Sequence, residues 1–420
     1  MVVIVEHAVK VRIYPNVAQE TLLAKTFGCK RWIWNYWREE RENYFKDHGN
    51  TVGFKYTPAK VLKETRPWLK EPDSIALQQA RRDLDTAYKN FFDGVKGKRT
   101  KMGYPKFKSK HAKQSYRTVQ TNGNIQINFN KRKLKLPKVG WVAYRDDRVF
   151  DEKIKNVTVT RTKGGRYFVS ILIYKEIDID EKTTIHESRI AAFDMSCGAF
   201  MVGTGNNRFA NPQFYRKHEN KLKKLHRELS RKQKGSSNRD KARVKLARFY
   251  EKIGNRRKDW QQKLSTNLVK EHDVIIIEDL NVEGMKRFNG GIAKTVTLDF
   301  SWGEFTRVLD YKCTWRGKHL VKVDRFYPSS KLCSNCGYKH DTLTLKEREW
   351  TCPECGIHHD RDANAAKNLD GEGKRILGEE RNITIIKTST VGTTGSHASG
   401  DRVRPAITGA VIDEGRIHAL

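Results

Sequence analysis

The sequence predicts a multidomain α/β protein in which a β domain with a helical insertion precedes an α/β domain that carries a four-cysteine ribbon. Three observations lead to this prediction. Short alternating apolar segments occur at the N-terminus and between residues 119 and 187, with mostly helical periodicity between them. From residue 188 buried-strand and helical patterns alternate. Two Cys-x2-Cys pairs then follow near the end of the chain.

The composition points to a partner that carries negative charge. The 420 residues include 83 Lys and Arg against 49 Asp and Glu, so the formal charge is +34 and the isoelectric point is near 9.9. Lys and Arg placed on phosphates release condensed counterions, which makes a nucleic acid the expected partner. A solvated basic surface is the alternative. The longest apolar runs, such as residues 1–5 and 274–277, are too short to span a membrane, and no membrane partner is expected.

The N-terminal region is predicted to form one strand followed by helices. Residues 1–15 alternate apolar and polar side chains and lack the features of a signal peptide. Residues 16–110 follow a helical pattern, and residues 103–118 are interpreted as a basic loop. Aromatic residues among bases in this region suit base stacking, although each is more simply explained as part of a helical core. These aromatic residues are Trp32, Trp34, Tyr36 and Trp37.

Residues 119–187 alternate apolar and polar side chains between Gly, Pro and Asn, which predicts a small β-barrel or sandwich. The opening strand is expected to pair with these strands. The helical region would then be an insertion into a β domain.

From residue 188 onward the chain follows the pattern of an α/β domain. Two apolar segments, which begin near residues 190 and 274, each end on an acid. Residues 211–272 between them predict a helical hairpin, and residues 211–260 hold 18 Lys and Arg against 5 Asp and Glu. A helix pair this polar is expected to rest against a charged partner. Residues 301–317 predict an amphipathic helix, and residues 318–326 a further strand.

Four cysteines predict one structural Zn²⁺ site. Cys333 and Cys336 form one Cys-x2-Cys pair, and Cys352 and Cys355 form a second. The two pairs are separated by 15 residues, and each is followed by glycine. Two such turns offer the four thiolates that tetrahedral zinc requires. A redox dithiol is the alternative, whereas catalytic zinc is disfavoured because four sulfurs leave no position for water.

The remaining histidines and cysteines are assigned smaller roles. His358 and His359 could compete as ligands but are expected to be surface or active-site neighbours. Cys29, Cys197 and Cys313 are interpreted as free thiols, which fits a reducing compartment.

Three acids far apart in the sequence are predicted to form a catalytic centre. Asp194 and Glu278 each end an apolar strand, where open α/β sheets place their sites, and Asp362 opens an Ala/Asn-rich helix. A single acid at a strand end is more often a turn former or a cap. Three acids at matching boundaries favour Mg²⁺ or Mn²⁺ held by carboxylates, because clustered carboxylates otherwise repel each other. Two ions about 4 Å apart promote phosphodiester hydrolysis.

The order of these features resembles TnpB, the transposon-encoded RNA-guided DNA endonuclease family that is related to compact type V CRISPR effectors. The similarity covers nearly the whole chain. Its most specific parts are the cysteine ribbon and the segment "DRDANAAKN". The segments "VRIYPNVAQETLLAKTFGCKRWIWNYW", "GYPKFKSK" and "YPSSKLCSNCG" also resemble the family.

The resemblance implies an RNase H-like (RuvC) nuclease core with a zinc-ribbon insertion, together with a β-barrel wedge domain that contains an inserted helical recognition domain. The nuclease core would take residues 188–327 and 361–382, with the ribbon at 328–360 between its last strand and the helix of the third acid. The wedge domain would take residues 1–15 and 119–187, and the recognition domain residues 16–118.

The resemblance also implies an activity and its partners. The protein would be a monomer that carries one guide RNA, derived from the transposon end, and cuts double-stranded target DNA beside a short motif. The family's three acids fall on Asp194, Glu278 and Asp362. A cleavage-dead RNA-guided repressor and a DNA transposase that joins strands are two other hypotheses, and the intact acids argue against the first.

Two details qualify the match. The family usually has glycine two residues after its first acid, where this chain has Ser196. Asp360 is a rival for Asp362, which we prefer because it is the acid of the family's Arg-Asp-x-Asn-Ala pattern.

The motif beside the target is expected to be read where the helical and β domains meet. Gln78, Thr121 and Asn122 are candidate readers there, because Gln and Asn pair bidentately with adenine. Residues 383–420 are rich in Gly, Thr and Ser and predict a disordered tail. The protein is expected in the cytoplasm, associated with the nucleoid.

Overall fold

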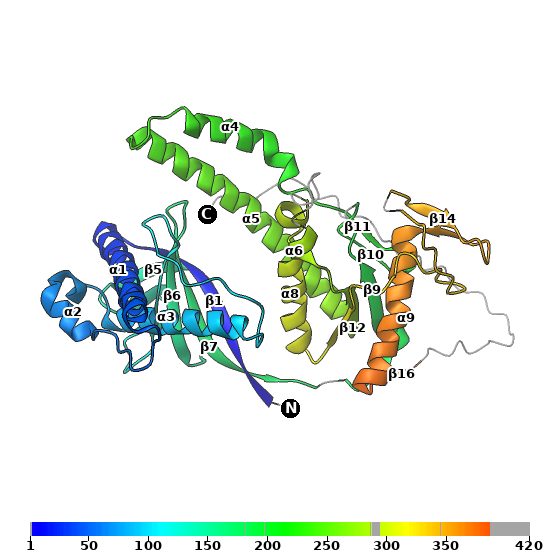
Figure 1. Ribbon diagram of the computed structural model, residues 1–420, viewed down its shortest axis with the longest axis horizontal. Coiled ribbons are helices and arrows are strands. Elements are labelled where there is room, and N and C mark those ends of the chain that lie inside the picture. The colour runs from blue at the N-terminus through cyan, green and yellow to red at the C-terminus, as the bar shows by residue number, and fades with distance from the viewer. Residues whose placement is uncertain are drawn as a thin grey trace.

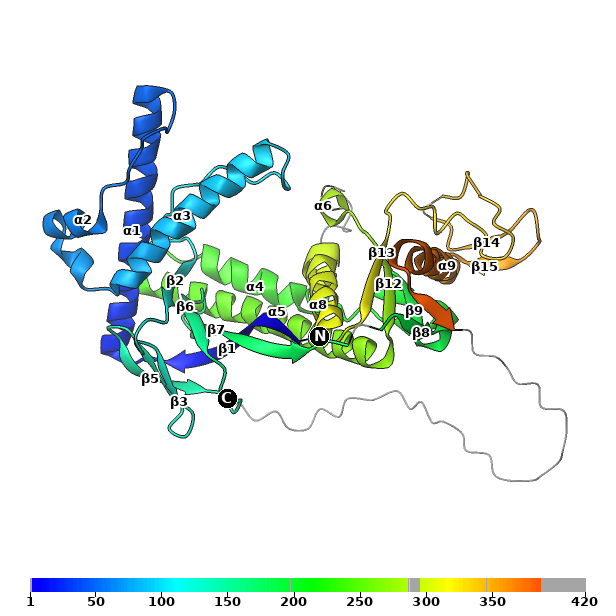
Figure 2. The same ribbon diagram turned by 90° about the horizontal axis from the view of Figure 1, so that it is seen from below.

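The computed structural model describes most of the chain, and its described residues are 2–180, 182–196, 198–285, 287, 295–344 and 346–386. A β-sheet with helices α1, α2 and α3 lies at one end, and a second sheet with α9 and the cysteine ribbon lies at the other (Figure 1). Helices α5 and α8 lie between these two parts in both views (Figures 1 and 2). Within the described residues, no helix is long and apolar enough to cross a membrane.

The first sheet has seven strands in the order β2-β6-β7-β1-β5-β4-β3. The opening strand pairs antiparallel with both β5 and β7, as the sequence predicts. The described pairings leave β2 and β3 as edges, so closure into a barrel stays a prediction. The strands are β1 (Val2–Tyr14), β2 (Gln114–Val119), β3 (Gln126–Asn128), β4 (Lys133–Leu136), β5 (Gly140–Arg145), β6 (Ile154–Arg161) and β7 (Tyr167–Asp178).

The strand β2 corrects one sequence interpretation. The sequence predicts a basic loop over residues 103–118, but within it Tyr116 and Thr118 of β2 are buried and alternate with partly exposed Arg117. Only two buried positions alternate within six residues, which is too short a pattern to stand out from the many nearby bases. The helical part of this region ends at Val95.

The helices between β1 and β2 pack around their own aromatic core. Asn16 and the side chain of Gln19 form a capping box that starts the first helix. Trp34 and Trp37 are buried in the core, whereas Trp32 and Tyr36 are half-buried and stack with ring centroids 5.1 Å apart. The helices are α1 (Val17–His48), α2 (Ala59–Thr65), the 3-10 helix η1 (Pro67–Lys70) and α3 (Ser74–Val95).

The second sheet has five strands in the order β11-β10-β9-β12-β13. Strands β9, β12 and β13 are parallel, whereas β10 and β11 run antiparallel to their neighbours. The strands are β9 (Ile190–Asp194), β10 (Met201–Gly203), β11 (Arg208–Phe209), β12 (Val274–Glu278) and β13 (His319–Val323).

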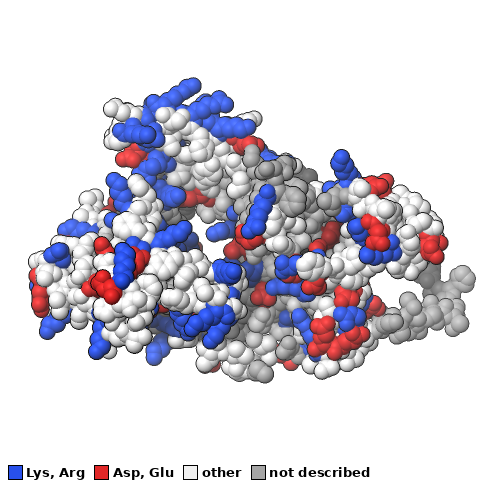
Figure 3. Space-filling model, in the orientation of Figure 1, with Lys and Arg blue, Asp and Glu red and all other residues white. Residues whose placement is uncertain are grey.

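Helices cover both faces of this sheet. Side chains of α5 and α8 share one core with Phe193 and Ile277, and side chains of α9 share another with Ala192 and Ile276. The predicted hairpin is α4 and α5, and its Lys and Arg side chains gather over α4 (Figure 3). The helices are α4 (Glu219–Ser230), α5 (Ser237–Glu271), α6 (Val282–Met285), α8 (Trp302–Thr314) and α9 (Arg361–Arg381), with 3-10 helices η2 (Glu187–Arg189), η3 (Thr204–Asn206) and η4 (Arg216–His218) and the π-helix η5 (Thr295–Phe300).

Two small sheets complete the described chain. The ribbon hairpin consists of β14 (Glu349–Thr351) and β15 (His358–Asp360). Strand β16 (Thr384–Ile386) pairs in parallel with β8 (Thr184–His186), so the prediction of a disordered tail from residue 383 is wrong at its start. The rest of that predicted tail, residues 387–420, lies outside the described residues, as does Cys197. Cys29 and Cys313 are free and buried.

Candidate functional site

Strand alternation brings Asp194 and Glu278 to the same face of the second sheet. In β9 and β12, Ala192 and Ile276 contact the α9 side, and the intervening Phe193 and Ile277 contact the opposite side. Asp194 and Glu278 follow as the next residues of each strand, and therefore project toward α9. Ile277 aligns with Phe193 in the parallel register, so the two acids end neighbouring strands at the same level.

The first turn of α9 supplies the third predicted acid. Ser196 Oγ donates a hydrogen bond to Asp362 Oδ2 at 2.7 Å and accepts one from the Gly198 N–H at 3.2 Å. Arg348 from the ribbon lies 3.6 Å from Asp362 Oδ1. The ribbon therefore supplies a cationic neighbour to Asp362.

The electrostatics of Asp194 show that Asp362 and Glu278 lie close enough to influence it. Burial, and then the nearby charges of Asp362 and Glu278, raise the pKa of Asp194 to about 8. Burial and the adjacent Asp279 raise the pKa of Glu278 as well. Raised pKa values in a carboxylate cluster mark a place where added positive charge would be strongly favoured.

Asp360 has a different environment from Asp362. Its side chain caps α9 by accepting a hydrogen bond from the Ala363 N–H at 2.9 Å, and it pairs with Arg208 at 2.5 Å. The hydrogen bond from the Ala363 N–H gives Asp360 a structural role as the cap of α9. Helix-capping rules alone do not separate the two acids, because either can begin a helix, and only the family's Arg-Asp-x-Asn-Ala pattern favours Asp362 in the sequence.

The four predicted cysteines converge. Their sulfurs all lie within 4.8 Å of one another, and Cys333 Sγ is 3.6 Å from Cys355 Sγ. Each knuckle ends on a glycine of positive φ, Gly337 at 80° and Gly356 at 70°. Among the described residues, the acidic trio is not drawn together as tightly as this set.

One histidine beside the cysteines differs from the expectation. His359 is buried, and its Nε2 lies 3.1 Å from Cys333 Sγ, so the surface alternative is wrong for this residue. His358 is exposed, as expected. An imidazole N–H in this position can hydrogen-bond a thiolate and fix its orientation.

Asparagines on α9 join the ribbon to the acidic site. The Ser334 N–H donates to Asn364 Oδ1 at 2.9 Å, and Asn364 Nδ2 donates to the Leu332 carbonyl at 2.6 Å. Asn368 Nδ2 donates to the same carbonyl at 2.7 Å. Leu332 and Ser334 flank Cys333, so the first knuckle is fastened to the helix that carries Asp362. The sequence shows these asparagines, but not their partners some 30 residues away.

The predicted motif readers lie on neighbouring elements. Gln78 is exposed on α3, and Thr121 and Asn122 are exposed in the turn after β2. A hydrogen bond from Thr118 to Asp73 joins β2 to the start of α3. No hydrogen bond among the described residues joins Gln78 to either turn residue.

Comparison with known proteins gives concordant matches. Family models match residues 176–289 ("Probable transposase"), residues 302–369 ("Cas12f1-like, TNB domain") and residues 1–50 ("Helix-turn-helix domain"). A "Putative RNA-guided DNA endonuclease" of Streptomyces pristinaespiralis is 38% identical over 379 residues, covering 88% of this chain and 90% of that protein.

Two further relatives extend the comparison. The "Putative RNA-guided DNA endonuclease InsQ" of Escherichia coli (strain K12) is 30% identical over 395 residues, covering 88% of this chain and 93% of its own. Among solved structures, a Cas12f1–sgRNA–target DNA complex is similar at a TM-score of 0.47 and 14% identity, covering 87% of this chain and 99% of that chain.

Proposed function

The chain belongs to the TnpB-like family of RNA-guided DNA endonucleases, and we propose on that basis that it uses a guide RNA to locate and cut double-stranded DNA. The observation that supports the proposal most strongly is the raised pKa of Asp194, which results from burial and from the nearby charges of Asp362 and Glu278. An RNase H-like core is supported by the strand order, in which three antiparallel strands are followed by two parallel ones.

The donor set fits hard divalent cations. Asp194, Glu278 and Asp362 offer only carboxylate oxygens, the ligands that Mg²⁺ and Mn²⁺ prefer. A pair of such ions held by these carboxylates would supply activation of a water and charge stabilisation at the leaving 3′ oxygen. Ser196 would hold Asp362 in one orientation through its 2.7 Å hydrogen bond, and the apolar strand residues below the acids would exclude bulk water from one side.

The cysteine set fits a structural Zn²⁺. Four thiolates within 4.8 Å provide a complete tetrahedral shell, and His359 would support Cys333 from outside that shell. We assign this ion the role of holding the first knuckle against α9, through Asn364. The ribbon would in this way fix the start of the helix that carries Asp362.

The proposed division of labour leaves sequence recognition to RNA. A guide derived from the transposon end would pair with the target strand, while the protein contacts backbone and shape. The basic hairpin α4–α5 offers a surface for that duplex. Gln78, Thr121 and Asn122 remain the proposed readers of the short motif beside the target.

The proposal is tested by purifying the protein with its native downstream locus and sequencing the RNA that remains bound. A plasmid library with randomised flanks is then challenged with this complex and Mg²⁺. We expect cuts only beside one short motif in plasmids that match the bound RNA. Guide-directed binding without cuts would indicate a repressor instead, and joined strand-transfer products would indicate a transposase.

A further inference from the structure

A hollow of about 290 Å³ lies where α1, α3 and the start of β2 meet. We propose that it binds one backbone phosphate of the target DNA and so positions the flanking duplex on the protein. The inference rests on the proposed function and adds a specific anion site to it. The residues that line the hollow are Phe27, Lys30, Arg31, Asp83, Lys108, Ala112, Lys113, Gln114 and Ser115.

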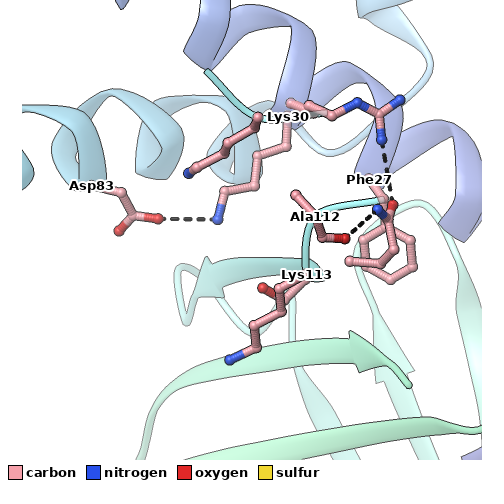
Figure 4. A pocket seen from close by; sticks show the side chains of 9 residues that line it. Phe27, Lys30, Asp83, Ala112 and Lys113 are labelled. Atoms are coloured by element: carbon pink, nitrogen blue, oxygen red, sulfur yellow. Dashed lines mark hydrogen bonds and ion pairs between the residues drawn. The ribbon is translucent and has the colours of Figure 1, made fainter. Parts of the chain in front are cut away.

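The walls of the hollow come from segments far apart in the sequence. Lys30 reaches from α1 to Asp83 on α3, and Lys113 lies on the opposite wall (Figure 4). The Lys30 side chain is 12% exposed and its Nζ lies 3.0 Å from Asp83 Oδ2. Arg31 from α1 approaches Gln114 Oε1 at 3.5 Å. These contacts hold the cations in place before any ligand arrives, which lowers the entropy cost of binding.

The charge of the lining favours an anion. Four cationic side chains face one acid, and that acid is already shared, because Arg117 also pairs with Asp83 at 2.8 Å. Asp83 therefore cannot neutralise Arg31, Lys108 and Lys113 as well. A phosphate oxygen would complete the site by accepting hydrogen bonds from these side chains.

Lys108 shows the strain of this arrangement independently. Its Nζ lies 3.0 Å from the centre of the Trp34 ring. Burial, and then the charge of Lys30, lower the pKa of Lys108 to about 8. An anion in the hollow would raise this pKa again, since its charge offsets that of Lys30 and favours the protonated amine.

The position of the hollow favours DNA over guide RNA as the source of the phosphate. It lies on α3 and β2, the elements that carry or precede the proposed motif readers Gln78, Thr121 and Asn122. Base readers need phosphate contacts nearby to fix their register on the duplex. A volume near 290 Å³ is at the small end of the roughly 300–1,000 Å³ of typical ligand pockets, which suits a phosphate and its sugar.

The test uses the assembled RNA–protein complex and a matched pair of variants. Arg31→Met with Lys113→Met removes two charges from the hollow. The control variant, Lys106→Met with Lys110→Met, also removes two charges. Both lysines are exposed and belong to the same loop as Lys113, but they do not line the hollow. Binding to target DNA is measured against salt concentration, and with neutral methylphosphonate substituted at one flank position at a time.

We expect wild type and the control variant to share one sensitive position, where methylphosphonate weakens binding about tenfold. The hollow variant should bind more weakly, with a salt slope lower by about 1, and should be indifferent at that position. Equal sensitivity in the hollow variant would overturn the proposal, and so would weaker guide RNA binding with unchanged DNA binding. Failure of wild type to bind matched DNA at all would instead reject the proposed function.

Discussion

At the scale of single residues, Asp194 has the most strongly shifted pKa among the three acids of the candidate site. Burial and the neighbouring acids raise the pKa of Asp194 to about 8 in the folded protein, well above the ordinary value for an aspartate, so its ionised form is disfavoured there. Stability is therefore expected to fall as pH rises from about 4 toward 8 in protein stripped of divalent ions. Asp194→Asn should remove this slope and raise the free energy of unfolding at pH 7 by up to about 4 kcal/mol, because each pKa unit corresponds to about 1.4 kcal/mol. Urea titrations at several pH values, in buffer without Mg²⁺ or Mn²⁺ but with zinc retained, measure this slope, and an unchanged slope in Asp194→Asn would contradict the prediction.

A second buried acid behaves in the opposite way. Burial alone would raise the pKa of Asp273, but hydrogen bonds from Lys182, Arg189 and Lys318 lower it overall. A lowered pKa contributes stability above the unfolded value, which is lost as pH falls below about 4. Asp273→Asn should cost roughly 3 kcal/mol at pH 7, because three cations lose one shared carboxylate.

The control for Asp273 is Asp147→Asn. Asp147 also pairs with an arginine, Arg132, but its side chain is 85% exposed. Exposed ion pairs contribute about 0–1 kcal/mol to stability, so Asp147→Asn should unfold at nearly the same urea concentration as wild type. Similar losses from both substitutions would show that the burial of Asp273 is not what matters.

The chemistry of the site could be predicted from the sequence only where a residue type has few alternative roles in proteins. The matched spacing of the four cysteines predicts that their side chains lie together, and the structure confirms this. The hydrogen bond from Ser196 to Asp362 joins residues 166 positions apart, and no local pattern specifies it. The substitution of serine for the family's glycine was the available signal, but it indicated only a small side chain.

At the scale of elements, the fit of α9 against the second sheet depends on one glycine. A Cβ built at Gly373 would lie 2.5 Å from Ile276 Cδ1, whereas one at Gly371 meets nothing within 4 Å. Gly373→Ala should therefore destabilise the protein by about 1–3 kcal/mol through overpacking. Gly371→Ala should be neutral or stabilise by up to about 1 kcal/mol, since alanine favours helix. Thermal unfolding compares the two, and equal effects would show that α9 does not pack as described.

The ribbon is expected to stabilise the start of α9. Chelation of zinc, or Cys352→Ser, should release the knuckle that Asn364 holds and so raise amide hydrogen exchange in residues 361–366. Exchange in the distant strand β6 should not change. Asn364→Ala should reproduce the effect with zinc still bound. Full protection of α9 after zinc removal would mean that the ribbon and the helix are independent.

Helices and strands could be predicted from the sequence where the apolar pattern is uninterrupted along the element. The two buried strands that end in Asp194 and Glu278, and the hairpin α4–α5, follow the sequence pattern closely. Strand β2 was missed because its two buried positions lie in a Lys-rich segment. Strand β16 was missed because three residues gain their structure only by pairing with β8, some 200 residues earlier.

At the scale of the whole molecule, the sequence predicts which parts exist better than how they meet. Pairing of the opening strand with later strands followed from alternation alone. The strand order of the first sheet, with β2 and β3 at its edges, could not be predicted from alternation, because strand order depends on contacts between distant segments. The hollow between α1, α3 and β2 could not be predicted either, since its cations come from two separate stretches of a chain rich in bases.

The central claim is that Asp362, together with Asp194 and Glu278, forms the centre that cuts DNA. It is tested most directly by measuring guide-directed plasmid cleavage in Mg²⁺ by wild type, Asp362→Asn and Asp360→Asn. Asparagine caps a helix as well as aspartate does, so Asp360→Asn preserves the start of α9. The account predicts that Asp362→Asn lowers the cleavage rate by about 10²-fold or more with guide RNA still bound, whereas Asp360→Asn stays within about tenfold of wild type. Cleavage by Asp362→Asn at the wild-type rate would contradict it.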